Sequence, residues 1–267
     1  MCSILLLLLP AALSLPILKV LPLGDSITFG CGSDAAPPDW YACCTPTSGG
    51  YRAPLWAALN GSSLNASIQM VGTMSNGPAW LPASQRAHEG HAGWTISMIK
   101  GLQRKWTAAQ PDVVLLLAGT NDIGQGHTEA AIVSDYAALL AALRATLPSA
   151  RLLVATVLSF YDSTKPELPA AVAALNSALP ALVAAVNGTT LVDLNAETGL
   201  CRQASDPLAP SLCAVCNGPC GGYNPAACPP QGYGYCHPTG AGYSLVGGAW
   251  AAALLPVLHE LAAARQG

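Results

Sequence analysis

Short apolar runs alternate with longer stretches of helical spacing along this chain of 267 residues. Several of the runs are apolar nearly throughout, which is typical of parallel strands that are covered on both faces. The runs that predict strands are 17–23, 67–71, 112–117, 151–157 and 190–194.

Helical patterns fill the intervals between these strands. In the segment 95–109 the apolar residues Ile96, Ile99, Leu102 and Trp106 recur at the spacing of one helix face. The segments that predict helices are 51–59, 95–109, 129–147, 170–186 and about 243–264.

The repeated alternation of strand and helix predicts an α/β fold, with three α/β/α layers around a five-stranded parallel sheet of the flavodoxin-like kind. Ligands bind such sheets at the carboxyl ends of the strands, so the residues that follow each strand are the candidates for chemistry. No second composition regime or internal repeat is visible, which favours a single domain over 15–267. Two long segments rich in Pro, Gly and Cys interrupt the pattern, namely 31–50 and a Cys-rich insert at 199–236.

The first residues, "MCSILLLLLPAALSLP", resemble a secretory signal. An apolar core at 4–9 is followed by the small-residue pattern "ALS", which predicts a signal peptide over 1–14. The start of a buried strand is the alternative interpretation. Several prolines and Lys19 interrupt the run before ~20 apolar residues accumulate, so we expect no stable membrane insertion.

The number of cysteines also favours export from the cell. The chain has ten cysteines, which would form disulfides after export, whereas the same spacing in the cytosol would indicate metal binding. Sequons at Asn60, Asn65 and Asn187 are potential glycan sites. We therefore expect a secreted, extracellular, disulfide-bonded glycoprotein. Nine cysteines remain without the presumed signal peptide, so at least one would be unpaired or intermolecular.

The charge content is low and leaves no basic stripe. Charged residues make up 9% of the chain and the net charge is −3. A protein that binds a phosphate backbone needs clustered Lys and Arg, so nucleic acid is not expected as a partner. We expect a monomer.

Polar residues with catalytic potential follow two of the predicted strands. In "LPLGDSITFG", Ser26 lies on a strand-to-helix turn, where its hydroxyl could act as a nucleophile or only cap the helix. In "LLLAGTNDIGQG", Asn121 could donate to an oxyanion or be an ordinary turn residue. Gly93 in "HEGHAGWTI" could supply a second N–H donor, and His237 in "YGYCHPTGAGY" is a candidate general base.

These blocks together resemble the SGNH hydrolase superfamily, the GDSL-type esterases. The variants "SGGYR", "VGTMSNG" and "HEGHAGWTI" are similar to the carbohydrate esterase family 3 branch, whose characterised members deacetylate xylan and related sugars. The resemblance implies the SGNH hydrolase fold and a serine esterase without a cofactor, acting on a small-molecule or polysaccharide ester. It implies Ser26 as nucleophile, His237 as general base, and an oxyanion hole made by Gly93, Asn121 and the Ser26 backbone N–H.

One position departs from the family pattern, in which the histidine block reads Asp-x-x-His-Pro. Gly234 stands where the aspartate would hold the imidazole, and loss of that function can cost about 10⁴ in rate. The Gly234 carbonyl could accept the His237 N–H instead, Asp206 or Asp193 could reach it, or the enzyme could be inactive. A disulfide at Cys236 could compensate by fixing the histidine loop.

Other residues are weaker candidates for catalysis, metal binding or substrate contact. His88 and His91 flank Glu89 but do not match a two-turn zinc motif, so hydrogen bonding around the Gly93 loop is the preferred interpretation. Closely spaced cysteines in the insert, Cys213, Cys216 and Cys220, could bind zinc, although disulfides fit an exported protein better. The residues left as possible substrate contacts are Asp25, Trp40 and His127.

Two alternative functions remain open at this point. One is a lipid or general short-chain ester hydrolase of the GDSL type, although no long apolar lid or amphipathic interfacial helix favours lipid. The other is a catalytically impaired sugar-binding protein on the same fold, which the missing aspartate would permit.

Overall fold

The fold is that of a computed structural model, which describes residues 15–32, 44–162, 165–200, 213–215 and 234–266. The predicted signal peptide, Trp40 and Asp206 lie outside the described residues, as do Cys216 and Cys220. The side chains of Cys213 and Cys236 are not described either, so the zinc and Cys236 disulfide hypotheses stay untested.

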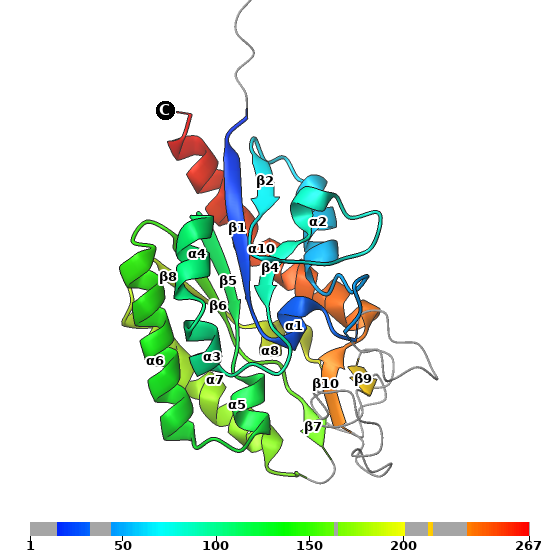
Figure 1. The fold of residues 1–267 in the computed structure, drawn as a ribbon, viewed down its shortest axis with the longest axis vertical. Coiled ribbons are helices and arrows are strands. Elements are labelled where there is room, and N and C mark those ends of the chain that lie inside the picture. The colour runs from blue at the N-terminus through cyan, green and yellow to red at the C-terminus, as the bar shows by residue number, and fades with distance from the viewer. Residues whose placement is uncertain (1–14, 33–43, 163–164, 201–212, 216–233, 267) are drawn as a thin grey trace, which may run out of the picture.

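A seven-stranded sheet forms the centre of the molecule (Figure 1). Its strands are β1 (Ile17–Gly24), β2 (Ser67–Met70), β3 (Met74–Ser75), β4 (Ala87–Gly90), β5 (Val113–Leu117), β6 (Arg151–Ala155) and β8 (Thr189–Val192). The five predicted strands correspond to β1, β2, β5, β6 and β8. They are all parallel and lie in the order β2-β1-β5-β6-β8, so the predicted flavodoxin-like arrangement is confirmed.

Strand β4 is the addition that matters most for the site. β2 pairs with the first half of β1, from Ile17 to Val20, and β4 pairs with its last two residues, Leu23 and Gly24. β3 then pairs antiparallel with β4. The sequence of β4, "AHEG", is short and polar although His88, Glu89 and Gly90 are buried, so an apolar pattern could not reveal it.

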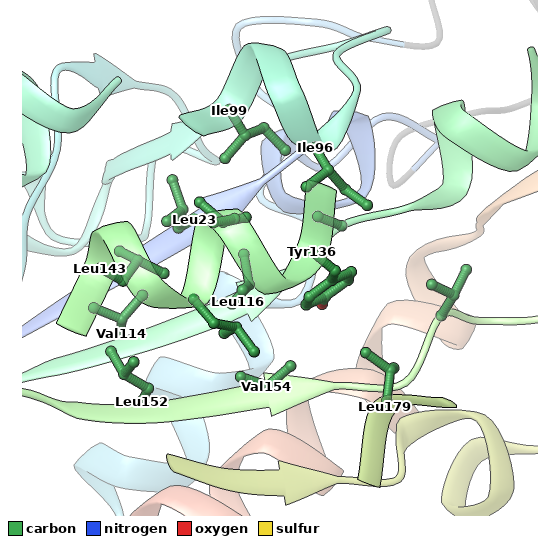
Figure 2. Packing of buried hydrophobic residues seen from close by; sticks show 14 of the residues in the cluster. Leu23, Ile96, Ile99, Val114, Leu116, Tyr136, Leu143, Leu152, Val154 and Leu179 are labelled. Carbon is green, nitrogen blue, oxygen red and sulfur yellow. The ribbon is translucent and has the colours of Figure 1, made fainter. Parts of the chain in front are cut away.

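Helices cover both faces of the sheet. One face carries α3 (Ile96–Lys100), α4 (Gln103–Ala109), α6 (Glu129–Thr146) and α7 (Leu168–Ala184), and the other carries α2 (Arg52–Asn60), α8 (Leu194–Thr198) and α10 (Gly240–Ala264) (Figure 1). Alternate residues of β5 face opposite layers, with Val114 and Leu116 in one core cluster and Val113 and Leu115 in the other. Figure 2 shows the first cluster, where Leu116 and Val154 pack near Tyr136 of α6.

The predicted helix at 95–109 is divided in the structure. α3 ends at Lys100, and Gly101 caps it by donating its N–H to the Met98 carbonyl at 3.0 Å. Glycine is a poor helix former, so the chain breaks there and resumes in α4 although the apolar spacing continues. The apolar residues still share one buried face, since Ile96, Ile99, Leu102 and Trp106 all belong to the same core cluster.

Helix α10 is long and apolar enough to cross a bilayer by length and composition alone. Core helices of globular proteins often meet that criterion. Here one side of the helix is buried through Tyr243, Trp250, Leu254 and Leu258, which pack in the second core cluster. The helix is therefore accounted for by its role in the core.

A second, smaller sheet carries the candidate histidine. It consists of β7 (Tyr161–Asp162), β10 (Gly234–Pro238) and β9 (Cys213–Val215), antiparallel and in the order β7-β10-β9. β10 lies beside the short helix α1 (Ser26–Phe29) in Figure 1. The Cys-rich insert shows no strand pattern in the sequence, yet it contributes β9 and the start of β10, and Ala214 pairs with His237.

Candidate active site

The candidate nucleophile lies where β1 passes into α1. β1 ends at Gly24, and Asp25 caps α1 by accepting the Ile27 N–H at 2.9 Å. Ser26 is the first helical residue and is 7% exposed. The first N–H groups of a helix have no intrahelical acceptor, so the Ser26 N–H is available to bind an anion.

His237 meets this serine from the far end of the chain. The His237 Nε2 lies 2.7 Å from the Ser26 Oγ, a hydrogen bond between residues 211 positions apart. Burial lowers the pKa of His237 to about 4, so the imidazole is neutral at neutral pH and can accept a proton. The predicted nucleophile and base are therefore brought together.

Gly93 occupies the tip of a tight turn whose first residue, His91, donates its N–H to the Gly24 carbonyl at 3.0 Å. Trp94 donates its N–H to the His91 carbonyl at 3.2 Å, and Gly93 has φ 80°. This is the geometry of a type II turn, in which the third residue needs a positive φ and is usually glycine. The central amide of such a turn is not used by the turn itself, which leaves the Gly93 N–H available to a ligand.

Helix α5 (Thr120–Gly124), which follows β5, holds this turn in place. The Asn121 side chain donates from Nδ2 to the Trp94 carbonyl at 2.8 Å. The next residue, Asp122, is fully buried and accepts the Ile96 N–H at the start of α3 at 3.0 Å. Burial raises the pKa of Asp122. Sequence reasoning gave Asp122 no role, although it stands beside Asn121 in "AGTND".

The C-terminal end of α1 is held by a buried arginine that sequence reasoning also missed. Arg52 donates from Nη2 to the Phe29 carbonyl at 3.0 Å and from Nε to the Thr28 carbonyl at 3.2 Å. It also binds Asn76 through the backbone oxygen at 3.0 Å and through Oδ1 at 2.6 Å. Burial lowers the pKa of Arg52 to about 10. The block "SGGYR" contributes to the family resemblance, but its sequence does not indicate which atoms the arginine contacts.

The two histidines of "HEGH" make hydrogen bonds within the loop. His88 is buried, with Nε2 2.5 Å from Asn76 Oδ1 and with Nδ1 accepting the Gly90 N–H at 2.9 Å. His91 Nε2 lies 2.8 Å from Glu89 Oε2. In the described parts of the chain no three His, Cys, Asp or Glu side chains are grouped so that they could hold a metal ion.

Asp25, His127 and Asp193 make contacts with groups other than the Ser26–His237 pair. Asp25 was a possible substrate contact, but its side chain is fully buried and caps α1. His127 is exposed at the end of α5, with Nδ1 3.6 Å from Asp122 Oδ1. Asp193 caps α8 and accepts the Thr156 hydroxyl at 2.9 Å. Gly234 begins β10, where it pairs with Asp162.

A disulfide joins Cys31 to Cys44 next to the nucleophile helix. Cys31 is buried directly after α1, and its carbonyl accepts the Tyr243 hydroxyl of α10 at 2.8 Å. The expectation that cysteines of the first long segment form disulfides is met for this pair. The pairing of the remaining cysteines lies outside the described residues.

A parallel α/β/α sandwich with a serine–histidine pair and backbone donors at the carboxyl edge of its sheet defines a class of hydrolases. Residues 23–245 match the GDSL-like lipase/acylhydrolase family. The chain belongs to this family and is a carboxylic ester hydrolase. None of the curated proteins matches the sequence at a significant level.

Solved structures share the fold at low sequence identity. A family 3 carbohydrate esterase from Clostridium thermocellum has a TM-score of 0.65 and 24% identity, covering 92% of this chain and 99% of that chain. A family 3 carbohydrate esterase from Talaromyces cellulolyticus has a TM-score of 0.64 and 20% identity, covering 91% and 99%. A variant of Axe2, an acetyl xylan esterase from Geobacillus stearothermophilus, has a TM-score of 0.55 and 19% identity, covering 87% and 92%.

Proposed function

We propose that this protein is a secreted serine esterase that removes acetyl groups from carbohydrate. The observation that carries the catalytic part is the 2.7 Å contact between Ser26 Oγ and His237 Nε2. The three candidate donors, the Ser26 N–H, the Gly93 N–H and the Asn121 amide, follow the parallel strands β1, β4 and β5, so they lie at the same edge of the sheet. A nucleophile, a neutral base and donors for an oxyanion are the parts that acyl transfer from an ester requires.

The reaction follows from these positions. Ser26 Oγ attacks the ester carbonyl while His237 Nε2 takes its proton, and the carbonyl oxygen becomes an oxyanion. The N–H groups of Ser26 and Gly93 stabilise that charge together with the second hydrogen on Asn121 Nδ2, since the first binds Trp94. The imidazolium then protonates the leaving alkoxide. Water, deprotonated by His237, releases the acyl group as a carboxylic acid and restores Ser26.

An acetylated carbohydrate is the substrate class that we infer. The blocks "VGTMSNG" and "HEGHAGWTI" resemble the carbohydrate esterase family 3 branch, and several solved structures with this fold carry carbohydrate esterase or acetyl xylan esterase names. A chain with only 9% charged residues also suits a neutral polyol. Longer acyl chains or lipid esters are the competing assignment within the same family.

Export is supported by features at separate places in the chain. The N-terminal apolar stretch fits a signal peptide, and the Cys31–Cys44 disulfide fits an oxidising compartment. The sequon residues Asn60, Asn65 and Asn187 are all exposed, so a glycan at each would meet no packed core.

The test uses protein purified under oxidising conditions and assayed on a short-chain aryl acetate, an aryl ester of a longer acid and acetylated xylan. Turnover of the acetates that is abolished in Ser26→Ala and in His237→Ala supports the proposal. Preference for the longer acyl chain contradicts the acetyl assignment. Binding of xylan by a protein without turnover would favour the sugar-binding alternative, and a cell fractionation that finds the protein only inside the cell would contradict export.

A further inference from the structure

We propose that Glu89 and His91 form a positioning pair that fixes the Gly93 turn as an oxyanion donor. The inference rests on the proposed function, because it concerns the donor of that same site. Glu89 Oε2 lies 2.8 Å from His91 Nε2, and His91 begins the turn whose third residue is Gly93. Neither side chain would touch the substrate, so their effect would be transmitted through the turn.

Glu89 is anchored independently of the histidine. It lies on β4 with its Cα paired to Leu23 of β1, and it is fully buried. Its Oε1 accepts the Thr73 N–H at 2.5 Å, which leaves Oε2 for His91. Burial acts to raise the pKa of Glu89, but the hydrogen bonds from His91 and Thr73 outweigh it and lower the pKa. The carboxylate is thus held at Oε1 by Thr73 and presents Oε2 to the first residue of the turn.

His91 is held at its backbone, its ring edge and its ring face. Its N–H donates to the Gly24 carbonyl at 3.0 Å, directly before the Asp25–Ser26 step of the nucleophile turn. Its ring edge binds Glu89, and its ring face stacks on Trp94 with centroids 4.2 Å apart and planes 20° apart. The side chain is 9% exposed. The first residue of the turn therefore cannot shift without breaking a buried contact.

The far end of the turn is held by the same arrangement. Trp94 receives the His91 ring on its face, and its carbonyl accepts the Asn121 Nδ2 hydrogen bond at 2.8 Å. Glu89, His91, Trp94 and Asn121 thus form one connected series of contacts from β4 to α5. This series joins two predicted oxyanion donors, the Gly93 N–H and the Asn121 amide.

The tip of the turn needs such support because the contact that reaches Gly93 itself is weak: the exposed Gln125 side chain donates from Nε2 to the Gly93 carbonyl at 3.4 Å. Gly93 is exposed, and a side chain at that position would meet no atom within 4 Å. Glycine is also the most flexible residue in the unfolded chain. An oxyanion donor must lie about 2.7–3.1 Å from the developing charge, so a small drift of the turn weakens the transition state more than the ground state. Burying a carboxylate is unfavourable unless it is fully hydrogen-bonded. Glu89 is buried beside this turn, and both of its oxygens accept a hydrogen bond.

The first experiment compares two substitutions of one residue. In Glu89→Gln the amide oxygen can still accept the Thr73 N–H, and the NH₂ group can donate to His91 Nε2 when the imidazole carries its proton on Nδ1, whereas Glu89→Leu removes both contacts at similar volume. On an aryl acetate we expect Glu89→Leu to lower kcat by about 10- to 100-fold, less than loss of a donor outright, with KM within about twofold. Glu89→Gln should stay within about threefold of wild type, so the conservative variant rescues the rate.

The second experiment removes the pair from the other side. His91→Phe keeps a flat ring against Trp94 but cannot bind Glu89, and it should lower kcat to a similar extent. The double variant Glu89→Leu/His91→Phe should be no slower than the slower single variant, because both remove the same interaction. His259→Phe is the matched control, since His259 is exposed on α10. Circular dichroism and thermal unfolding identify any variant that fails to fold.

Each outcome is decisive. A folded Glu89→Leu protein with wild-type kcat overturns the inference, as does a loss seen only in KM or an equal loss in Glu89→Gln and Glu89→Leu. If Glu89→Leu does not fold, a folded His91→Phe protein with wild-type kcat overturns it instead. Wild-type protein without any turnover contradicts the proposed function itself, whereas active wild type with unaffected variants contradicts the positioning pair alone.

Discussion

Asn121 donates its side-chain amide to the Trp94 carbonyl at 2.8 Å, and the second hydrogen of the same amide is the one assigned to the oxyanion in the proposed mechanism. Asn121→Ala removes both contributions and should lower kcat by about 10² to 10³. Asn121→Asp should be at least as damaging, because a carboxylate cannot donate and would repel the developing charge. Steady-state kinetics on an aryl acetate measure this. A folded Asn121→Ala protein with wild-type kcat would remove Asn121 from the oxyanion hole.

The pKa of His237 predicts an unusually acidic limit to activity. Burial lowers that pKa to about 4, and the base must be neutral to take the Ser26 proton. The logarithm of kcat/KM should therefore rise with pH to a plateau that begins just above pH 4, rather than above the ordinary value of 6.5. A pH–rate profile on an ester stable in mild acid tests this. A midpoint near 6.5 would show that the free enzyme holds His237 in a more hydrated state.

Asp193 can be tested as the group that orients His237. The structure places its carboxylate at the start of α8, where Oδ1 accepts the Ala196 N–H at 3.1 Å and the Thr156 hydroxyl at 2.9 Å. Asparagine is an equally good helix cap, so Asp193→Asn should keep both stability and kcat close to wild type. A fall in kcat approaching 10⁴ would instead identify Asp193 as the third member of a triad. A retained kcat leaves the Gly234 carbonyl and Asp206 as the candidates.

The parallel framework could be predicted from sequence because its strands are short and because β1, β5 and β6 are mostly apolar. The Ser26–His237 contact could be predicted only from the resemblance of separate blocks, since no local pattern joins residues 211 positions apart. β4 and the strand that carries His237 were missed for a physical reason. Both are held by pairing with other strands and by buried hydrogen bonds, and neither feature leaves a hydrophobic period in the chain.

The buried polar residues show the same limit. From residue type alone, a surface position is expected for Arg52, Glu89 and Asp122, because charged side chains are seldom fully buried. Each is fully buried here because backbone groups from distant segments satisfy it, as Ile96 does for Asp122. Asp25 shows the same limit. It was a possible substrate contact, but its side chain is fully buried and accepts the Ile27 N–H as the cap of α1.

The Asp25 carboxyl should make stability fall with rising pH. Desolvation by burial raises its pKa from 3.8 to about 7, so between these values the folded protein binds a proton that the unfolded chain has lost. Its stabilising contribution is complete below pH 3.8 and disappears as pH rises through about 7. Asp25→Asn can still cap α1 and does not titrate. We expect the free energy of unfolding of Asp25→Asn, relative to wild type, to increase by up to about 4 kcal/mol from pH 4 to pH 8. Urea unfolding at both pH values measures the difference, and a difference independent of pH would contradict the raised pKa.

Arg52 should be the side chain whose loss most damages the support of the nucleophile helix. It is fully buried and donates to the Thr28 and Phe29 carbonyls and to Asn76, so Arg52→Met leaves several buried acceptors unpaired. We expect a loss of about 3 kcal/mol or more in the free energy of unfolding. Arg52→Lys should recover little, because one ammonium cannot reach acceptors that a planar guanidinium spans.

Arg104→Met, at an exposed position of α4, is the control, and its free energy of unfolding should be close to that of wild type. Chemical denaturation measures the stabilities, and kcat measured well below the unfolding transition tests whether the remaining folded protein still holds Ser26 in place. An Arg52→Met protein as stable as the Arg104→Met control would show that these contacts contribute little to the fold.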